Sequence, residues 1–354
     1  MPEFDKILIA WYQQNKRNLP WRSNNDPYFV WVSEIILQQT RVDTGTDYFL
    51  RFIKTFPDAI SLANAEENDV LKLWQGLGYY SRARNMHAAA LQIINEYKGG
   101  FPSSYVDIRK LKGVGDYTAA AIASISFGLP YPVIDGNVFR VLSRIFGVET
   151  AIDTLKGKRE FTELASLLID KENPGQFNEA LMEFGALQCT PKNPECPTCP
   201  FNDRCIALSK NEISNLPVKL KQTKVRKRYF NYLLVNDGNS FYIEKRVEKD
   251  IWHNLYQFPL IETSDTVNLE ELISNERFVN LFDPKEIVIG SMGPEIVHLL
   301  THQRLHVKFI DIKSLKVVPQ INWIKVSLTG INNFPVPKII NDFLLEMHSN
   351  NNEE

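Results

Sequence analysis

Four cysteines lie within one short segment of the chain, and the protein has no others. Their spacing is C-x6-C-x2-C-x5-C, at Cys189, Cys196, Cys199 and Cys205. Clustered thiols of this kind are typical of a metal site in a reducing compartment rather than of disulfides. Four soft thiolates can hold a tetrahedral zinc ion or an iron–sulfur cluster, and the spacing alone favours neither. Because the protein would fill every ligand position, the bound group would have a structural or electronic role.

Glu34 lies in a stretch, residues 28–39, whose apolar residues recur at helical spacing. The residues four and three positions before it are Val30 and Trp31, and the residue three positions after it is Leu37. A mostly apolar helix face would therefore surround its carboxyl group. Because desolvation penalises the charged form, we expect the pKa of Glu34 to rise. A rise of about two pKa units would leave it about half protonated near pH 6.5, and partial burial can produce a rise of that size. Such an acid can protonate a leaving group. Without this context, a glutamate in a helix is more often a solvated surface residue.

Asp135 directly precedes another helical pattern and is followed by Gly136 and Asn137. One interpretation is an ordinary helix N-cap, whose side chain accepts a hydrogen bond from a backbone amide. The same amides and the positive end of the helix would keep this carboxylate ionised, so that it could stabilise a positive charge on a substrate. Glu34 and Asp135 would then act as acid and anion, because different environments separate their pKa values.

Two glycines shape the segment 111–118, which lies between two helical patterns. Gly113 and Gly115 favour a tight turn, and the backbone amides of the turn and of the following helix could bind an anion. A helix-hairpin-helix binds a DNA phosphate in this way. A glycine-rich turn without any ligand is the simpler interpretation.

The chain changes in character after Cys205. Helical patterns fill the first part, at 28–39, 46–55, 67–75, 83–97, 117–127, 138–146, 158–169 and 176–188. Strand patterns follow at 229–235, 240–246, 287–291 and 306–312, with helical stretches near 269–282 and 337–347. We therefore expect an all-α domain at 1–210, a basic inter-domain linker at 211–228, an α+β domain at 229–348 and a disordered tail at 349–354.

The composition agrees with two domains and says little about a partner. The chain has 354 residues, of which 44% are hydrophobic and 23% charged, and its net charge is −2. This length is large for one core, and a surface that binds nucleic acid would have to be a local patch. The longest apolar stretch, 119–134, is interrupted by Gly128, Pro130 and Pro132. We therefore expect a cytoplasmic protein without membrane contact, associated with the nucleoid if it is bacterial.

The order of these features resembles the endonuclease III superfamily of DNA glycosylases, in which a helix-hairpin-helix precedes a loop with an aspartate and then four cysteines. Within that superfamily, residues 31–42 (WVSEIILQQTRV) and 76–84 (GLGYYSRAR) are similar to signatures of the MutY-type adenine DNA glycosylases. The resemblance runs from about residue 4 into the C-terminal domain. It implies a monomeric, base-flipping enzyme that removes adenine paired with 8-oxoguanine or guanine in double-stranded DNA. It also implies a [4Fe-4S] cluster on the four cysteines.

The resemblance further implies roles for single residues. Glu34 would be the general acid and Asp135 would stabilise an oxocarbenium-like sugar, with Asn137 also among the catalytic residues. Tyr117 occupies the position at which bifunctional relatives carry a lysine nucleophile. A phenol cannot form a Schiff base, so the enzyme is expected to be monofunctional, although core packing would also explain a tyrosine here.

Other positions match residues with which the family binds its DNA substrate. Those that match the adenine pocket are Trp21, Arg22 and Glu179. A second group matches residues that enter the opened duplex or support the opposite base, and it comprises Gln38, Gln39, Leu77 and Tyr79. Arg82 lies in the same motif as Leu77 and Tyr79, residues 76–84. Gly113 and Gly115 would contact a phosphate.

Residues 247–259 resemble the Nudix-fold domain with which these glycosylases recognise 8-oxoguanine. The chain beyond them has no Arg-Glu-x2-Glu-Glu pattern, so we expect a recognition domain without catalytic activity of its own. The family's Phe-Ser-His loop corresponds to residues 300–302, where Leu300 replaces the aromatic residue and Thr301 the serine. Thr301 and His302 are the candidates for contact with 8-oxoguanine.

Two other functions are compatible with parts of this pattern. A thymine or uracil mismatch glycosylase of the same superfamily can carry a tyrosine at position 117, but it would not be expected to have Glu34 or the long C-terminal domain. A non-catalytic lesion-binding protein would share the DNA-binding features, but it would not need both Glu34 and Asp135.

Overall fold

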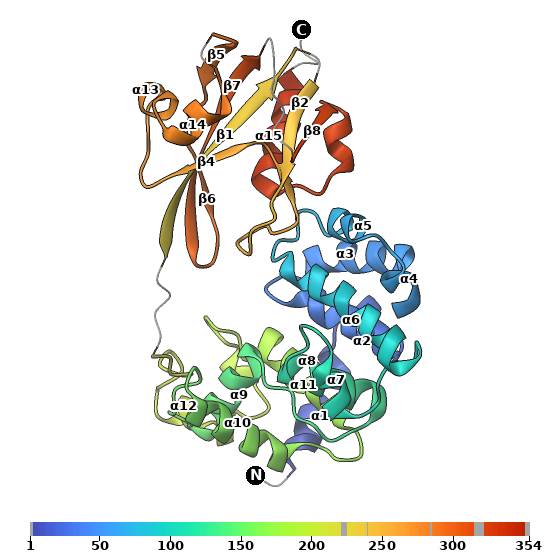
Figure 1. Ribbon diagram of the computed structural model, residues 1–354. Coiled ribbons are helices and arrows are strands. Elements are labelled where there is room, and N and C mark those ends of the chain that lie inside the picture. The colour runs from blue at the N-terminus through green and yellow to red at the C-terminus, as the bar shows by residue number, and fades with distance from the viewer. Residues whose placement is uncertain (1–2, 221–224, 239, 284, 315–321, 351–354) are drawn as a thin grey trace. The chain divides into compact units, whose positions relative to one another are not determined.

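The computed structural model describes residues 3–220, 225–238, 240–283, 285–314 and 322–350 (Figure 1). The chain divides into two compact units. The helical unit comprises Met1–Ala65 and Asn85–Lys221, and the sheet unit comprises Glu66–Arg84 and Gln222–Glu354. A segment from the first quarter of the sequence, including α5 (Glu67–Leu73), therefore packs with the C-terminal strands.

Helices form the framework of the helical unit, which confirms the all-α organisation expected for the first part of the chain. They are α1 (Phe4–Asn15), α2 (Pro27–Leu37), α3 (Val42–Thr55), α4 (Ala59–Ala63), most of α6 (Ser81–Tyr97), α7 (Tyr105–Lys110), α8 (Asp116–Phe127), α9 (Gly136–Phe146), α10 (Leu155–Leu168), α11 (Pro174–Leu187) and α12 (Ile206–Ser209). Asp26 caps α2, because its carboxylate accepts a hydrogen bond from the Tyr28 amide.

Four of these helices, α1, α4, α7 and α12, were not predicted from the sequence. α4, α7 and α12 are short, with five, six and four residues, so they carry little periodic signal. α1 is longer, and Phe4, Leu8 and Trp11 form its buried stripe. Their i, i+4, i+7 spacing is a signal that could have revealed this helix.

The core of the helical unit is shared by α1, α9 and α11. Phe4 of α1, Val141 of α9 and Phe177 of α11 are among its buried members. Phe201, from the segment that carries the cysteines, is also buried and stacks on Phe4 with ring centroids 4.9 Å apart. Burial of this ring anchors the cysteine segment to the helices around it.

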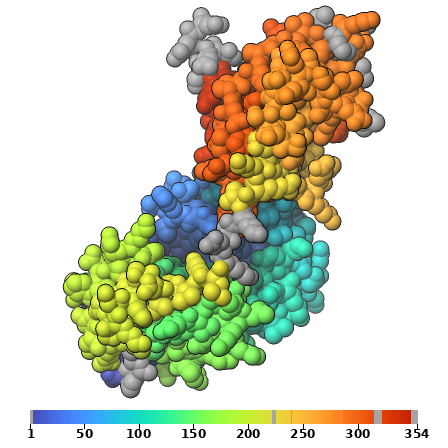
Figure 2. Space-filling view, turned by 90° about the vertical axis from the view of Figure 1, so that its left-hand side faces the viewer, coloured from blue at the N-terminus to red at the C-terminus, as the bar shows by residue number. Residues whose placement is uncertain are grey.

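The first part of the expected linker, residues 211–220, packs across the surface of the helical unit (Figure 2). The Val218 carbonyl accepts a hydrogen bond from the Ile152 amide, and the Leu220 amide donates to the Asp153 carboxylate. At the other end, β1 begins at Arg226, so the last three residues of the expected linker belong to a strand. Residues 221–224 lie outside the described part of the chain.

The sheet unit contains a mixed β-sheet, and the α+β organisation expected for the C-terminal part is confirmed. Its strands are β1 (Arg226–Asn236), β2 (Ser240–Lys245), β3 (Tyr256–Gln257), β4 (Leu260–Thr263), β5 (Ile287–Met292), β6 (Ile296–Leu299), β7 (Gln303–Ser314) and β8 (Trp323–Ser327). β1 runs parallel to β7, from Arg226 opposite Gln303 to Asn236 opposite Lys313. β3, β4, β6 and β8 were not predicted, because they have only two to five residues.

Alternation along β1 directs its side chains to both faces of the sheet. Phe230 and Tyr232 belong to a core that includes residues of α15 (Lys338–Asn350). Leu233 and Val235 belong to a second core with residues of α13 (Leu269–Ile273) and α14 (Glu276–Leu281). The sheet is therefore covered on one face by α15 and on the other by α13 and α14 (Figure 1).

Two boundaries in the sheet unit differ from the prediction. A single helix was expected at 269–282, but the Asn275 side chain accepts a hydrogen bond from the Arg277 amide and starts a second helix there. α15 extends to Asn350, so it includes the first two residues of the tail that was expected to be disordered, and 351–354 lie outside the described residues. Within the described ranges, no helix is both long and apolar enough to span a bilayer.

Candidate active site

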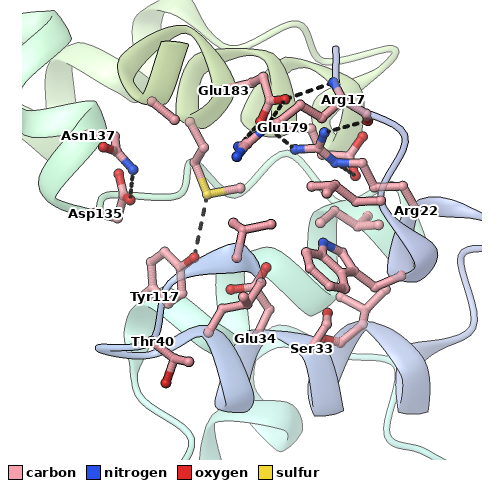
Figure 3. A pocket seen from close by; sticks show the side chains of 18 residues that line it. Arg17, Arg22, Ser33, Glu34, Thr40, Tyr117, Asp135, Asn137, Glu179 and Glu183 are labelled. Atoms are coloured by element: carbon pink, nitrogen blue, oxygen red, sulfur yellow. Dashed lines mark hydrogen bonds and ion pairs between the residues drawn. The ribbon is translucent and has the colours of Figure 1, made fainter. Parts of the chain in front are cut away.

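A cavity of about 250 Å³ in the helical unit gathers the candidate catalytic and adenine-pocket residues (Figure 3). Those that line it are Trp21, Arg22, Glu34, Tyr117, Asp135, Asn137 and Glu179. They come from the short 3₁₀ helix η1 (Pro20–Arg22), from α2, α8 and α11, and from the start of α9. Segments far apart in the sequence therefore meet in one place.

Glu34 lies on α2 and is only 8% exposed. Val30 and Leu37 line the cavity beside it, as their spacing predicted, whereas Trp31 does not. Burial raises the pKa of Glu34 to about 7, although a hydrogen bond from the Tyr117 hydroxyl opposes the shift. The predicted rise is confirmed, and the carboxyl group is poised to give up a proton near neutral pH.

Asp135 is the N-cap of α9. One of its carboxylate oxygens accepts a hydrogen bond from the Val138 amide at 2.7 Å, and the other accepts one from the Asn137 side chain at 2.8 Å. Burial nevertheless has the larger effect and raises the pKa of Asp135, while these two bonds lower it. The sequence pattern predicted that the amides would keep this carboxylate ionised, and it gave no sign of the burial.

Arg140 fixes the orientation of Asn137. Its guanidinium donates to the Asn137 side-chain oxygen at 2.9 Å and to the carbonyl oxygens of Gly185 and Cys189, both at 2.7 Å. Because the oxygen of Asn137 is engaged by Arg140, its amide nitrogen faces Asp135. The carboxylate is thus held on two sides.

Tyr117, near the start of α8, forms part of the cavity wall. Its hydroxyl lies 3.5 Å from the Met182 sulfur and is hydrogen-bonded to Glu34. Burial, together with the nearby carboxylates Glu34 and Asp135, raises the pKa of Tyr117 well above its usual value. The phenol is therefore neutral and can donate a hydrogen bond to Glu34.

Glu183, which the sequence analysis did not single out, lies at the same cavity and is 2% exposed. It accepts three hydrogen bonds from Arg17, at 2.7 to 2.9 Å, and one from Arg22 at 3.0 Å. Burial alone would raise its pKa, but these bonds outweigh burial and lower the pKa of Glu183 to about 2. Its position four residues after Glu179 on α11 is the sequence signal that could have indicated it.

Glu179 is held mainly by Tyr12, whose hydroxyl donates to its carboxylate at 3.0 Å. The Arg22 Nε atom lies 3.6 Å from the other oxygen of Glu179. Burial raises the pKa of Glu179, and the charge of Arg22 opposes that shift. Two carboxylates on one helix, Glu179 and Glu183, therefore have pKa values shifted in opposite directions.

The glycine turn between α7 and α8 lies apart from this cavity. Gly113 has a φ of +77°, and a Cβ atom there would lie 2.6 Å from the Cβ of Asn85. Gly115 is the N-cap of α8, with a φ of −92° and open space around its Cα. Only Gly113 therefore requires a glycine for the turn itself.

The four cysteines follow α11, and their thiols are near enough to interact electrostatically with one another. Burial has the larger effect and, together with the three neighbouring thiols, raises the pKa of Cys199 to about 11. Arg144 joins two of the cysteines, because its guanidinium lies 3.5 Å from the Cys189 sulfur and its carbonyl accepts a hydrogen bond from Cys205. Four soft donors beside a guanidinium fit an anionic cluster. Among the described residues, no three cysteine, histidine or acidic side chains are grouped as a single metal ion requires.

In the sheet unit, a cavity of about 340 Å³ gathers Leu77, Tyr79, Thr301 and His302. The hydroxyls of Tyr79 and Thr301 are hydrogen-bonded to each other. The Arg82 guanidinium lies over the Tyr79 ring, 5.4 Å from its centroid, and donates to the Gly78 carbonyl. Leu300 also lines this cavity.

Two other predicted positions lie outside both cavities. Gln38, after the end of α2, donates a hydrogen bond from its side chain to the Thr118 hydroxyl at 3.3 Å. Gln39 has a φ of +59°, in the left-handed region that non-glycine residues seldom occupy.

Two family matches cover most of the chain. Residues 32–166 match the HhH-GPD superfamily of base excision DNA repair proteins, and residues 231–346 match the NUDIX domain. Among solved structures, a thermostable thymine-DNA glycosylase is 28% identical, with a TM-score of 0.55, over 58% of this chain and 95% of that chain. These matches agree with a helical glycosylase fold joined to a Nudix-like domain.

Curated relatives carry a more specific name. An adenine DNA glycosylase of Buchnera aphidicola (subsp. Schizaphis graminum) is 38% identical, over 84% of this chain and 85% of that protein. An adenine DNA glycosylase of Homo sapiens is 41% identical, over 60% of this chain and 41% of that protein. Because the first similarity spans most of both proteins, the chain belongs to the adenine DNA glycosylase family and is a DNA glycosylase, a hydrolase of N-glycosidic bonds.

Proposed function

We propose that this protein excises adenine paired with 8-oxoguanine or guanine in double-stranded DNA, acting as a monomer and without cutting the strand. The observation that carries the proposal is Glu34, a buried carboxyl group with a pKa of about 7 that shares a cavity with Asp135. Adenine is a poor leaving group as an anion, so its removal requires an acid. A glutamate that is protonated near neutral pH supplies one.

In the proposed reaction, the flipped adenine enters the cavity and Glu34 transfers its proton to a ring nitrogen of the base. The glycosidic bond then breaks, and its electron pair stays with the base. The sugar becomes an oxocarbenium-like cation beside Asp135, whose carboxylate stabilises the positive charge. Water then adds to the cation and gives the abasic sugar, and the proton that this water loses restores the acid form of Glu34. The bonds that Asp135 accepts from Val138 and Asn137 hold it in place for this role.

Tyr117 supports a monofunctional reaction. A bifunctional glycosylase needs an amine to attack the sugar, and a phenol cannot form the Schiff base that leads to strand cleavage. Its hydrogen bond to Glu34 suits it to orient the acid instead. Trp21, Arg22 and Glu179 are proposed to surround the base.

We propose that the sheet-unit cavity lined by Tyr79, Thr301 and His302 recognises the base opposite the adenine. The threonine hydroxyl and the imidazole can each donate or accept a hydrogen bond, as the altered edge of 8-oxoguanine requires. Leu300 contributes apolar contact where relatives have an aromatic residue. The family's anion-binding turn, with Gly113 and Gly115, is proposed to hold a phosphate of the backbone.

We also propose that Cys189, Cys196, Cys199 and Cys205 hold a [4Fe-4S] cluster, which would fix the cysteine segment and could exchange an electron. The mutual interaction of the four thiols and the guanidinium of Arg144 suit an anionic metal site, and the resemblance to the endonuclease III superfamily favours the cluster over a single zinc ion. Protein purified under anaerobic, iron-replete conditions should be brown and contain about four irons per chain. A colourless protein with one zinc per chain would contradict the assignment.

The proposed function is tested with duplexes that carry adenine opposite 8-oxoguanine, guanine or cytosine, each with and without hot alkali afterwards. We expect base loss from the first two duplexes and strand breaks only after alkali. Excision of thymine from a mismatch, with adenine left intact, would favour the alternative function of a mismatch glycosylase. The similarity to the thymine-DNA glycosylase structure, at 28% identity, is the reason to include this substrate.

A further inference from the structure

A second cavity, of about 360 Å³, adjoins the candidate active-site cavity within the helical unit. The two cavities share Arg17, Leu19, Arg22, Ile125 and Glu179 as lining residues, and we call these shared side chains the partition. We call the second one the rear cavity. Lys16, Asn18 and Asn25 also line it and are exposed, so the rear cavity opens to solvent.

The two ends of the active-site cavity are lined by different side chains. Asp135 and Asn137 lie at one end, Arg22 and Glu179 lie toward the other, and Glu34 lies between them (Figure 3). Neither Glu34 nor Asp135 lines the rear cavity. With the sugar placed beside Asp135, as the proposed function requires, the base points past Glu34 toward the partition.

Within the partition, Arg22 and Glu179 interact only weakly with each other. The Arg22 Nε and Glu179 Oε1 atoms are 3.6 Å apart, beyond the usual N–H···O range of about 2.7–3.2 Å. Each side chain has a closer partner elsewhere, because Glu183 accepts from Arg22 at 3.0 Å and Glu179 accepts from Tyr12 at 3.0 Å. Arg22 and Glu179 can therefore separate without either losing its closest partner.

The reaction creates a need for such an opening. After the glycosidic bond breaks, the sugar remains part of the DNA at the Asp135 end of the cavity, so the freed base lies between the DNA and the partition. We propose that the freed adenine passes between Arg22 and Glu179 into the rear cavity and leaves through it while the DNA product is still bound. This inference rests on the proposed function.

The side chains that line the rear cavity are suited to bind free adenine. The base keeps the bonding electron pair and the proton from Glu34, so it leaves as neutral adenine. Asn18, Asn25 and Gln176 offer amide donors and acceptors to its ring nitrogens and amino group. The cations of Lys16 and Arg17 at the same cavity would disfavour a positively charged ligand.

The test follows a labelled adenine in a duplex with 8-oxoguanine opposite, mixed with excess full-length enzyme. Quenched samples give the rate of excision, and rapid ultrafiltration under native conditions gives the rate at which free base leaves the complex. Asn18→Trp and Gln176→Trp should obstruct the rear cavity. Gln14→Trp, at an exposed position of α1 outside both cavities, is the matched control.

We expect all three variants to excise adenine at rates close to that of the parent. The parent and Gln14→Trp should release the base before the DNA dissociates, whereas Asn18→Trp and Gln176→Trp should release it at least about tenfold more slowly. Base release from the parent only together with the DNA, equal release by all variants, or equal slowing by Gln14→Trp would overturn the inference. A parent that leaves adenine in the duplex would instead refute the proposed function.

A second measurement does not depend on any variant. The parent enzyme is bound to a duplex with a stable abasic-site analogue opposite 8-oxoguanine, and free labelled adenine is then added. Adenine should enter the complex faster than the DNA leaves it. Entry only after the DNA dissociates would overturn the inference even if the tryptophan variants failed to fold.

Discussion

Glu34 and Glu183 are both buried glutamates at one cavity, yet their pKa values shift in opposite directions. Burial raises that of Glu34 to about 7, since the hydrogen bond from Tyr117 opposes the shift only in part. Burial acts on Glu183 too, but the bonds from Arg17 and Arg22 outweigh it and lower its pKa to about 2. The hydrogen-bond partners thus decide that one glutamate keeps its proton near neutral pH and the other does not.

The substitution Glu183→Gln tests whether the charge of Glu183 is held by Arg17 and Arg22. It keeps the shape of the side chain but leaves the charges of Arg17 and Arg22 without their buried counter-charge. We expect the free energy of unfolding at pH 7 to fall by about 3 kcal/mol, measured by urea denaturation. Glu163→Gln is the control, because Glu163 is exposed and its pair with Arg159 at 3.8 Å should contribute less than about 1 kcal/mol. Equal losses in the two variants would contradict this account of Glu183.

At the scale of single elements, local sequence predicted some features and missed others. The caps of α2 and α9 at Asp26 and Asp135 were foreseeable, because an N-cap is defined by neighbouring residues. The ion pairs of Glu183 could not be foreseen from the sequence. A glutamate on a helix gives no local sign that two arginines from the chain before α2 will contact it. Packing decides such contacts, and a single sequence does not contain them explicitly.

The turn between α7 and α8 gives a prediction at this scale. The sequence pattern does not distinguish its two glycines, but only Gly113 has a positive φ and a close neighbour in Asn85. Gly113→Ala should therefore destabilise the protein by about 1–2 kcal/mol or more. Gly115→Ala should cost only about 0.5 kcal/mol, as a poorer cap residue. Thermal unfolding compares the two variants, and a larger loss for Gly115→Ala would contradict the geometry described here.

At the scale of the whole molecule, the candidate active-site cavity and the cavity lined by Thr301 lie in different compact units. The sequence order suggested that residues 66–84 belong with the helices around them, whereas they pack with the C-terminal strands in the sheet unit. This places Tyr79 in contact with Thr301, more than two hundred residues later in the chain. No local pattern could have predicted that contact, because it depends on tertiary packing.

The sheet-unit cavity gives the prediction at this scale. The double substitution Thr301→Ala and His302→Ala should reduce the preference for 8-oxoguanine over guanine opposite adenine by about tenfold, the cost of about one hydrogen bond. Excision of adenine opposite guanine should change little, because the active-site cavity is untouched. Ser264→Ala, exposed and outside that cavity, is the control. A preference ratio equal to that of the parent would show that the discrimination lies elsewhere.

The central claim is that protonated Glu34 drives the loss of adenine, and single-turnover excision of adenine opposite 8-oxoguanine tests it most directly. Since the acid form is required and the pKa is about 7, the parent rate should fall as pH rises through that value. Glu34→Gln should bind the duplex normally but excise adenine about 10² to 10⁴ times more slowly, without this pH dependence. A Glu34→Gln variant that excises adenine within a few-fold of the parent rate would contradict the account.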